Sequence, residues 1–271
     1  MNNLDLVPRE KAHVRQLLKF LGGEWRTPAN GGQSSSSPNI LKPTTPFFAI
    51  GDIHGCVALL KDLLARIDPD NDQNLIFLGD YVDRGPQSAE TLSLLFKLSR
   101  ERPDQVVCLK GNHEKMMCEF VDDPLDRGKR WLRNGGLDTL RSYGIDGLGE
   151  QPTPDEALDA CDALEKALPK GMLEWLRELP LTWNSGNVWC VHAGMDPQTT
   201  PQRQRSGTLL WGHRDFMKLS RGDAICVVHG HTIVDAPANA NGRVSIDTGA
   251  YVTGRLTAAR IADQQCTFIC T

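Results

Sequence analysis

Five of the seven histidines in this chain lie in short, glycine-containing polar segments that directly follow apolar runs. The runs and their ends read FFAIGDIHG (47–55), NLIFLGDYVDRG (74–85), VVCLKGNHE (106–114), VWCVHAG (188–194) and ICVVHGHT (225–232). Carboxylate, amide and imidazole groups, with no cysteine in these polar ends, suit a divalent metal of intermediate hardness such as Mn²⁺, Fe²⁺ or Zn²⁺. An ordinary turn would explain one such segment, whereas five of them favour metal binding.

These segments offer more candidate ligands than one tetrahedral site needs. Two divalent ions about 3.5–4 Å apart can share one carboxylate, lower the pKa of a bound water and neutralise phosphate oxygens, and so hydrolyse phosphate esters through metal-bound hydroxide. We therefore expect two divalent ions, with Mn²⁺ as the first choice and Fe, Zn, Co or Mg as alternatives.

Three further residues could act on a phosphate held there. His113 directly follows Asn112, so its protonated imidazole would lie beside the metals and could protonate the leaving group. Asp83 would orient that imidazole and raise its pKa. Arg84 would bind phosphate oxygens through its planar guanidinium. A structural ion pair between Asp83 and Arg84 is the alternative interpretation.

A scaffold must bring these strand ends together. From residue 47 onward, strand-like runs alternate with helical patterns, which predicts an α/β fold. In such folds ligands bind beyond the ends of the strands. The later runs follow one another with few helices between them, so the sheets are expected to be mixed. Residues 120–180 break the alternation and are predicted to form a helical cap.

The first 46 residues differ from the rest of the chain. Apolar residues at helical spacing predict a short amphipathic helix around residues 6–20. The segment TPANGGQSSSSPNILKPTTP (27–46) is typical of a flexible linker. The predicted organisation is an N-terminal helix and linker over 1–46 and a catalytic domain over 47–271.

The composition argues against several classes of protein. The chain has 271 residues, 24% of them charged, and a net charge of −4, which gives no sign of a nucleic-acid or anionic-membrane surface. No apolar run approaches the roughly 20 residues that span a bilayer, and the N-terminus lacks a secretory layout. Eight cysteines without a Cys-x-x-Cys pair favour reduced thiols and a cytoplasmic location. Nothing in the sequence predicts an oligomeric state.

The ordered segments GDIHG, GDYVDRG, GNHE, VHAG and GHT resemble the phosphoprotein phosphatase (PPP) family of calcineurin-like metallophosphoesterases, over residues 47 to about 261. The resemblance implies a β-sandwich flanked by helices, with two metals at its loop edge and Asp80 between them. It implies that His113 and Asp83 form the general-acid pair and that Arg84 and Asn112 contact phosphate. The metal ligands it implies are Asp52, His54, Asp80, Asn112, His192 and His231.

Within this family the chain is similar to compact bacterial-type serine/threonine phosphatases and to ApaH-like diadenosine tetraphosphatases. The similarity lies in Cys56, Pro86 and the segments WLRNGG and DTGAYVTGRLTA. The complete GDYVDRG and GNHE favour a phosphoserine or phosphothreonine protein phosphatase. The alternative is a tetraphosphatase that hydrolyses diadenosine tetraphosphate or another nucleotide polyphosphate. A third hypothesis is a non-catalytic metal-binding or scaffold protein, against which the intact His113, Asp83 and Arg84 argue.

Two departures from the family pattern concern the phosphate. Lys110 stands before GNHE, where Arg is frequent, and lacks the two-pronged guanidinium. Compact members often carry Trp-x-Arg, but here Trp211 is followed by Gly212, His213 and Arg214. We expect Arg214 to contact the phosphate, with His213 as the alternative.

Other residues are interpreted from their context. His229 is expected to be a buried histidine in the core or beside the ligands, and Glu114 to brace the site. Tyr251 would lie either near the phosphate or in the core. The remaining residues are expected to be structural: Trp131, Trp175 and Trp183 in the cap, Asn134, Gly135 and Gly136 in a loop, and Cys266 and Cys270 in a strand. The alternative for the three tryptophans is an aromatic platform for an adenine base, and the alternative for the loop is a role at the substrate pocket.

Overall fold

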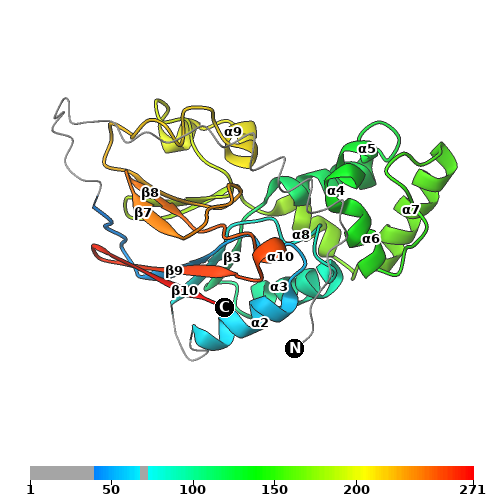
Figure 1. The fold of residues 1–271 in the computed structure, drawn as a ribbon, viewed down its shortest axis with the longest axis horizontal. Coiled ribbons are helices and arrows are strands. Elements are labelled where there is room, and N and C mark those ends of the chain that lie inside the picture. Colours follow the sequence, from blue (N-terminus) through cyan, green and yellow to red (C-terminus); the bar gives the residue numbers. More distant parts are fainter. Residues whose placement is uncertain (1–39, 68–72) are drawn as a thin grey trace. The chain divides into compact units, whose positions relative to one another are not determined.

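The computed structural model describes residues 40–67 and 73–271 (Figure 1). The helix predicted around residues 6–20 and the linker up to residue 39 lie outside this part. The end of the predicted linker is anchored. The backbone N–H of Lys42 donates to Oδ1 of Asn187 (2.7 Å), and that of Thr45 donates to Oγ of Ser185 (3.0 Å). The last residues of the predicted linker therefore contact residues 185 and 187.

In the described residues, ten strands form two five-stranded sheets. The first has the order β10–β9–β1–β2–β3 and contains β1 (Phe47–Ile50), β2 (Asn74–Phe77), β3 (Val106–Cys108), β9 (Thr257–Ala262) and β10 (Gln265–Cys270). The second has the order β4–β5–β6–β8–β7 and contains β4 (Thr182–Ser185), β5 (Val188–Val191), β6 (Cys226–His229), β7 (Ala238–Ala240) and β8 (Arg243–Ser245).

Both sheets are mixed, as predicted. Strands β1, β2 and β3 run parallel, while β9 is antiparallel to β1 and to β10. Strands β5, β6 and β8 also run parallel, with β4 and β7 as antiparallel edges. Parallel neighbours end at the same edge of their sheet, so the polar segments that follow β1, β2 and β3 are brought together, as are those after β5 and β6.

The apolar run of β1 explains how the layers pack. All four residues are buried. Phe47 and Ala49 lie in the core between the two sheets, whereas Phe48 and Ile50 lie in the core under the helices. Successive side chains of a strand point to opposite faces, so a strand buried on both faces needs a continuous apolar run. The inner core contains residues of both sheets, including Leu78, Val188, Val228, Val244 and Ile261.

Helices cover the outer faces of the sandwich (Figure 1). Helices α2 (Val57–Arg66) and α3 (Ser88–Glu101) pack on the first sheet through buried leucines. On the second sheet, Leu209 of α9 (Ser206–Trp211) packs with Val191 and Val227. Two short elements complete this part: the 3₁₀ turn η2 (Pro201–Arg203) and α10 (Ala250–Thr253). No described helix has the length and apolar character needed to cross a membrane.

A helical insertion lies between β3 and β4 along the chain. It begins after α4 (Asn112–Asp122) and comprises α5 (Gly128–Trp131), the π-helical turn η1 (Leu132–Gly136), α6 (Leu137–Ser142), α7 (Pro154–Ala167) and α8 (Met172–Glu178). Thr153 begins α7 as a capping box with Glu156, and Pro154 occupies the first turn.

Of the three tryptophans predicted in the cap, Trp183 lies in a strand and Trp175 packs against a helix of the body. Trp183 belongs to β4, and its ring lies 4.8 Å from that of Phe47. This prediction was wrong because Trp183 lies beyond residue 180, where the predicted cap ends, and the strand begins at Thr182. Trp175 of α8 packs 5.4 Å from Phe96 of α3, which joins the insertion to the body. Cys266 and Cys270 lie in β10, as expected.

Candidate metal centre

The polar segments of both sheets meet at one place. Asp80 lies at the centre: its carboxylate is 3.5 Å from Nε2 of His54 and 3.3 Å from Nε2 of His192. Two groups of side chains could each hold a cation, and they share Asp80. The first group is His54, Asp80 and His113, and the second is Asp80, His192 and His231. One carboxylate thus stands between two neighbouring clusters.

Backbone carbonyls fix the orientation of two imidazoles. Nδ1 of His54 lies 2.8 Å from the carbonyl oxygen of Val82, and Nδ1 of His192 lies 3.0 Å from that of Leu78. Each ring therefore presents Nε2 to the cluster. An outer hydrogen bond of this kind sets the tautomer and aim of a metal-binding histidine.

The other predicted ligands adjoin the second group. Oδ1 of Asn112 lies 2.8 Å from Nε2 of His192, and Nδ1 of His231 lies 3.2 Å from the same nitrogen. Asp52 accepts from the backbone N–H of His231 at 3.0 and 3.2 Å. All six predicted ligands are thus brought together, although the two groups themselves include neither Asp52 nor Asn112.

Burial and charge separate the histidines by their proton affinity. Burial, reinforced by Arg84, lowers the pKa of His54. Burial also lowers the pKa of His192, and it lowers that of His231 to about 4. These rings are neutral near pH 7, the form that binds a metal. His113 differs: burial opposes its charge, yet the carboxylates of Asp80 and Asp83 raise its pKa above the usual value.

The carboxylates are crowded in a buried space. Burial would raise the pKa of Asp80, but the surrounding imidazoles, His192 first, hold it well below its usual value. Burial, Asp247 and Asp80 raise the pKa of Asp52. Burial also raises the pKa of Asp247 to about 6. Such an excess of buried negative charge is what divalent cations would neutralise, so the residues present fit a metal centre.

Asp83 and Arg84 form a second layer around the first group, and both contact its His113. Nδ1 of His113 lies 2.6 Å from Oδ2 of Asp83, and both side chains are buried. The guanidinium of Arg84 lies 3.0 Å from Nε2 of His54 and 3.1 Å from Nε2 of His113. Asp83 therefore pairs with the imidazole, and no ion pair between Asp83 and Arg84 is found among the described residues.

Strained backbone is concentrated in this cluster. Seven non-glycine residues of the described ranges have positive φ, and five of them belong to the site: His54, Asp80, Asp83, Arg84 and His231. Left-handed backbone costs energy for any residue with a Cβ atom and persists where surrounding packing enforces it. It is concentrated at functional sites, which supports the assignment of this place as the active centre.

Glu114 both caps α4 and braces the site. Its buried carboxylate accepts from the backbone N–H groups of Asp80 (2.9 Å), Tyr81 (2.7 Å) and Gly111 (2.9 Å). It thus holds the loop after β2 against the start of the helix after β3. The bracing role expected from the sequence is confirmed by these contacts.

Tyr251 and His229 receive definite places. The Tyr251 ring lies 5.2 Å from the His54 ring, and the Arg84 guanidinium lies over it at 5.0 Å, so this tyrosine borders the cluster. His229 is fully buried, with Nε2 2.8 Å from Oγ of Ser245 and its ring 4.9 Å from that of Phe216. His229 is the core histidine that the sequence predicted.

The predicted second phosphate contact does not lie in the cluster. The side chain of Arg214 is 86% exposed and pairs with its neighbour Asp215 at 3.4 Å. The ring of His213 accepts from the backbone N–H of Asp215. Lys110 donates from Nζ to the carbonyl oxygen of Arg177 (2.6 Å), at the end of α8. The Lys110 ammonium is therefore directed to the helical insertion.

Trp131 and Thr139 are functional neighbours that the sequence did not reveal. Both are buried and both donate to the carboxylate of Asp83. Trp131 does pack in the insertion, with its ring 4.9 Å from that of Phe120, but its indole nitrogen reaches the site. A tryptophan or threonine in a helix carries no local signal for such a contact.

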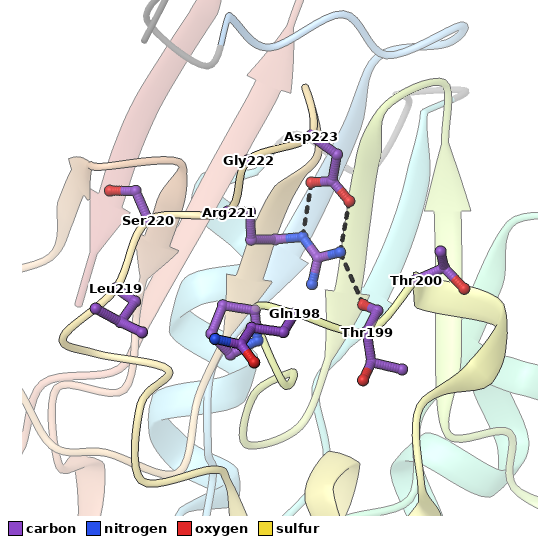
Figure 2. A pocket seen from close by; sticks show the side chains of 9 residues that line it. Gln198, Thr199, Thr200, Leu219, Ser220, Arg221, Gly222 and Asp223 are labelled. Atoms are coloured by element: carbon purple, nitrogen blue, oxygen red, sulfur yellow. Dashed lines mark hydrogen bonds and ion pairs between the residues drawn. The ribbon is translucent and has the colours of Figure 1, made fainter. Parts of the chain in front are cut away.

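A hollow of about 480 Å³ lies elsewhere, between the segments 197–200 and 219–223 (Figure 2). Its lining includes none of the candidate ligands. The guanidinium of Arg221 donates to both carboxylate oxygens of Asp223 and to the carbonyl oxygens of Asp196 and Thr199. These bonds make Arg221 a structural tie between the two segments.

The two mixed sheets and the Asp- and His-rich cluster at their strand ends fit a metal-dependent phosphoester or phosphoanhydride hydrolase, and comparison with known proteins shows that the chain belongs to this class. The chain matches the calcineurin-like phosphoesterases over residues 45–254 and belongs to that family, whose members use a dinuclear metal centre. The fold class predicted from the sequence is confirmed.

Two relatives in sequence are named tetraphosphatases. Bis(5'-nucleosyl)-tetraphosphatase PrpE [asymmetrical] from Oceanobacillus iheyensis is 26% identical over 242 residues, which cover 80% of this chain and 88% of the relative. A symmetrical bis(5'-nucleosyl)-tetraphosphatase from Pseudomonas fluorescens is 36% identical over 157 residues, 56% of this chain and 44% of the relative.

Solved structures share the fold. One, provisionally called a diadenosine tetraphosphatase, aligns with a TM-score of 0.58 and 20% identity over 84% of this chain and 94% of its own. A protein serine/threonine phosphatase from Saccharomyces cerevisiae, similar to human phosphatase PP5, aligns with a TM-score of 0.53 and 17% identity. This alignment covers 86% of this chain and 83% of that phosphatase. At these identities the structures establish the fold and leave the substrate open.

Proposed function

We propose that this protein is a two-metal hydrolase of bis(5'-nucleosyl) tetraphosphates. The observation that carries the proposal is the carboxylate of Asp80, shared by two clusters of imidazoles at the strand ends of both sheets. The substrate is supported by the two tetraphosphatase relatives, one of which aligns over most of this chain. The sequence by itself favoured a protein phosphatase, and these relatives favour its alternative.

The ligands divide between two positions. Asp52, His54 and Asp80 would hold one ion, while Asp80 would also contribute to the second with Asn112, His192 and His231. Oxygen and neutral nitrogen donors without thiolate suit Mn²⁺, the first ion to test. When bound, the ions supply a water activated for attack and neutralise charge on the phosphate.

Arg84 would orient the phosphate. Its two terminal nitrogens lie beside Nε2 of His54 and Nε2 of His113, so the guanidinium spans the first group of ligands. A planar guanidinium can donate two parallel hydrogen bonds to phosphate oxygens. In that role Arg84 would fix the reacting phosphorus and stabilise charge on its oxygens.

His113 would protonate the departing oxygen. Asp83 binds Nδ1, which leaves Nε2 facing the cluster, 3.8 Å from Asp80. The Asp80 and Asp83 carboxylates favour the protonated ring, which is the form an acid requires. As the P–O bond breaks, the proton on Nε2 passes to the leaving oxygen.

The test compares two substrates on Mn²⁺-loaded protein. We expect kcat/KM for diadenosine tetraphosphate to exceed that for a phosphothreonine peptide, and product analysis would tell symmetrical from asymmetrical cleavage. A preference for the peptide would replace the proposal with a protein phosphatase. Stoichiometric metal without turnover of either substrate would favour the non-catalytic hypothesis.

A further inference from the structure

We propose that Trp131 and Thr139 are positioning residues for the Asp83–His113 pair, so that the helical insertion sets the geometry of the acid. This inference rests on the proposed role of His113. Trp131 ends α5 and Thr139 lies in α6, whereas Asp83 follows β2 and His113 begins α4. The insertion therefore reaches the site through these two buried side chains.

Three donors surround the Asp83 carboxylate. Nε1 of Trp131 lies 3.0 Å from Oδ1 and 2.9 Å from Oδ2. Oγ1 of Thr139 donates to Oδ1 at 2.6 Å, and Nδ1 of His113 lies 2.6 Å from Oδ2. Asp83 is fully buried, so these protein groups replace water around its oxygens.

These three donors hold the Asp83 carboxylate in a single orientation. If it rotated about its Cβ–Cγ bond, the bond to Thr139 or the bond to His113 would be lost. A buried acceptor that loses its donor is costly, so the two donors from the insertion hold the plane in which Asp83 meets the imidazole. The direction of Nε2 of His113 then follows from the position of the insertion.

The glycines of WLRNGG bring the insertion close enough. Gly135 has φ 105°, and a Cβ atom there would lie 2.7 Å from the backbone nitrogen of Arg84. A Cβ atom on Gly136 would lie 2.5 Å from the ring of Trp131. The turn η1 thus packs directly on the left-handed residues Asp83 and Arg84. The sequence analysis expected this segment to be an ordinary loop, but its Gly135 packs against Asp83 and Arg84 in the site.

Thr139 offers a clean substitution. Thr139→Val keeps the shape and removes the hydroxyl, whereas Thr139→Ser keeps the hydroxyl. The backbone N–H of Asp83 also donates to Oγ of Ser88 (3.0 Å), so the valine variant leaves that N–H with an acceptor. Leu140→Ala is the matched control, because Leu140 is a buried neighbour in α6 whose side chain makes no hydrogen bond to Asp83.

The kinetic experiment uses two substrates that differ in their need for an acid. Phenyl phosphate has a poor leaving group and p-nitrophenyl phosphate a good one. On Mn²⁺-loaded protein we expect Thr139→Val to lower kcat for phenyl phosphate at least about tenfold and for p-nitrophenyl phosphate less than about twofold, with KM unchanged. Thr139→Ser should restore the wild-type ratio of the two rates, and Leu140→Ala should leave it unchanged.

A spectroscopic readout does not depend on turnover. In ¹⁵N-labelled, Mg²⁺-loaded protein, the Nδ1 proton of His113 should resonate far downfield because of its short bond to Asp83. We expect this resonance to move upfield or disappear in Thr139→Val and in Trp131→Phe, and to stay in Thr139→Ser and Leu140→Ala. Trp131→Phe tests the second donor, and thermal unfolding verifies that it is folded.

His113→Ala separates the two levels of the proposal. If kcat of this variant falls equally for phenyl phosphate and p-nitrophenyl phosphate, the acid role of His113 is wrong and the positioning role is wrong with it. If kcat of this variant falls mainly for phenyl phosphate, the acid role stands. If Thr139→Val then behaves like Leu140→Ala in both the ratio of kcat values and the His113 resonance, the positioning role is overturned.

Discussion

The Nδ1 atom of His113 lies 2.6 Å from an oxygen of Asp83, in a place closed to solvent. A hydrogen bond this short between a carboxylate and an imidazole is charge-assisted and fixes the ring. The opposite nitrogen of His113 therefore faces Asp80 and Arg84. This relationship makes His113 the group to test first among the histidines of the cluster.

Asp83→Asn should reduce turnover with little loss of metal. The amide keeps the shape but removes the charge that favours the protonated imidazole, so we expect kcat for phenyl phosphate to fall about 10²-fold or more. Metal content, measured by elemental analysis, should match that of the wild type. Equal loss of metal and activity would mean that Asp83 acts through the ligands and not through His113.

Asp80→Ala should abolish metal binding at both positions, because one carboxylate serves both clusters. Elemental analysis after Mn²⁺ loading and gel filtration should give fewer than one ion per chain, against two in the wild type. Asp263→Asn, an exposed carboxylate in the turn between β9 and β10, is the matched control and should keep both ions. Retention of one ion in Asp80→Ala would contradict a shared ligand.

Glu114→Gln should destabilise the fold. The carboxylate accepts from the N–H groups of Asp80, Tyr81 and Gly111, and an amide replaces one acceptor oxygen with a donor. We expect the free energy of unfolding, measured by urea denaturation of metal-free protein, to fall by at least about 2 kcal/mol. Glu119→Gln, on the same helix and partly exposed, should change it by less than about 1 kcal/mol.

The tie between Arg221 and Asp223 should depend on pH (Figure 2). Burial would raise the pKa of Asp223, but hydrogen bonds from Arg221 and its charge lower it. A carboxyl with a lowered folded pKa adds stability above its unfolded pKa of about 3.9, and this stability is lost as the pH falls through the folded value.

Asp223→Asn should therefore be less stable than the wild type at pH 7, by about 1 kcal/mol in a partly exposed pair. The difference should shrink below about pH 3, where the wild-type carboxyl is protonated. Urea denaturation at both pH values measures this change. A difference that stays constant between them would assign the effect to shape and not to charge.

The grouping of the candidate ligands could be predicted from the sequence because each follows its strand within a few residues. Asp52 and Asp80 come directly after β1 and β2, and parallel strands bring such ends to one edge. Glycine within two residues of each of these polar residues marked the tight turns. The prediction thus needed only local pattern and the topology of neighbouring strands.

The support around Asp83 could not be predicted in this way. Trp131 and Thr139 are 48 and 56 residues away in sequence, and only the packing of the insertion brings them to the carboxylate. The position of Arg214 could not be predicted for a related reason. Its spacing from Trp211 suggested a phosphate contact, but α9 ends at Trp211 and the Arg214 side chain lies in solvent. Contacts made by tertiary packing leave no regular spacing.

The placement of ligands on both sheets has a consequence for how the chain could be divided. A cut in the exposed segment between α6 and α7 would leave Asp80 and Asn112 on one fragment and His192 and His231 on the other. Strand β9, on the second fragment, pairs with β1 on the first, so reassembly has its own driving contacts. Neither fragment alone would carry a complete centre, and phosphohydrolase activity would serve as a complementation signal for the union of the two.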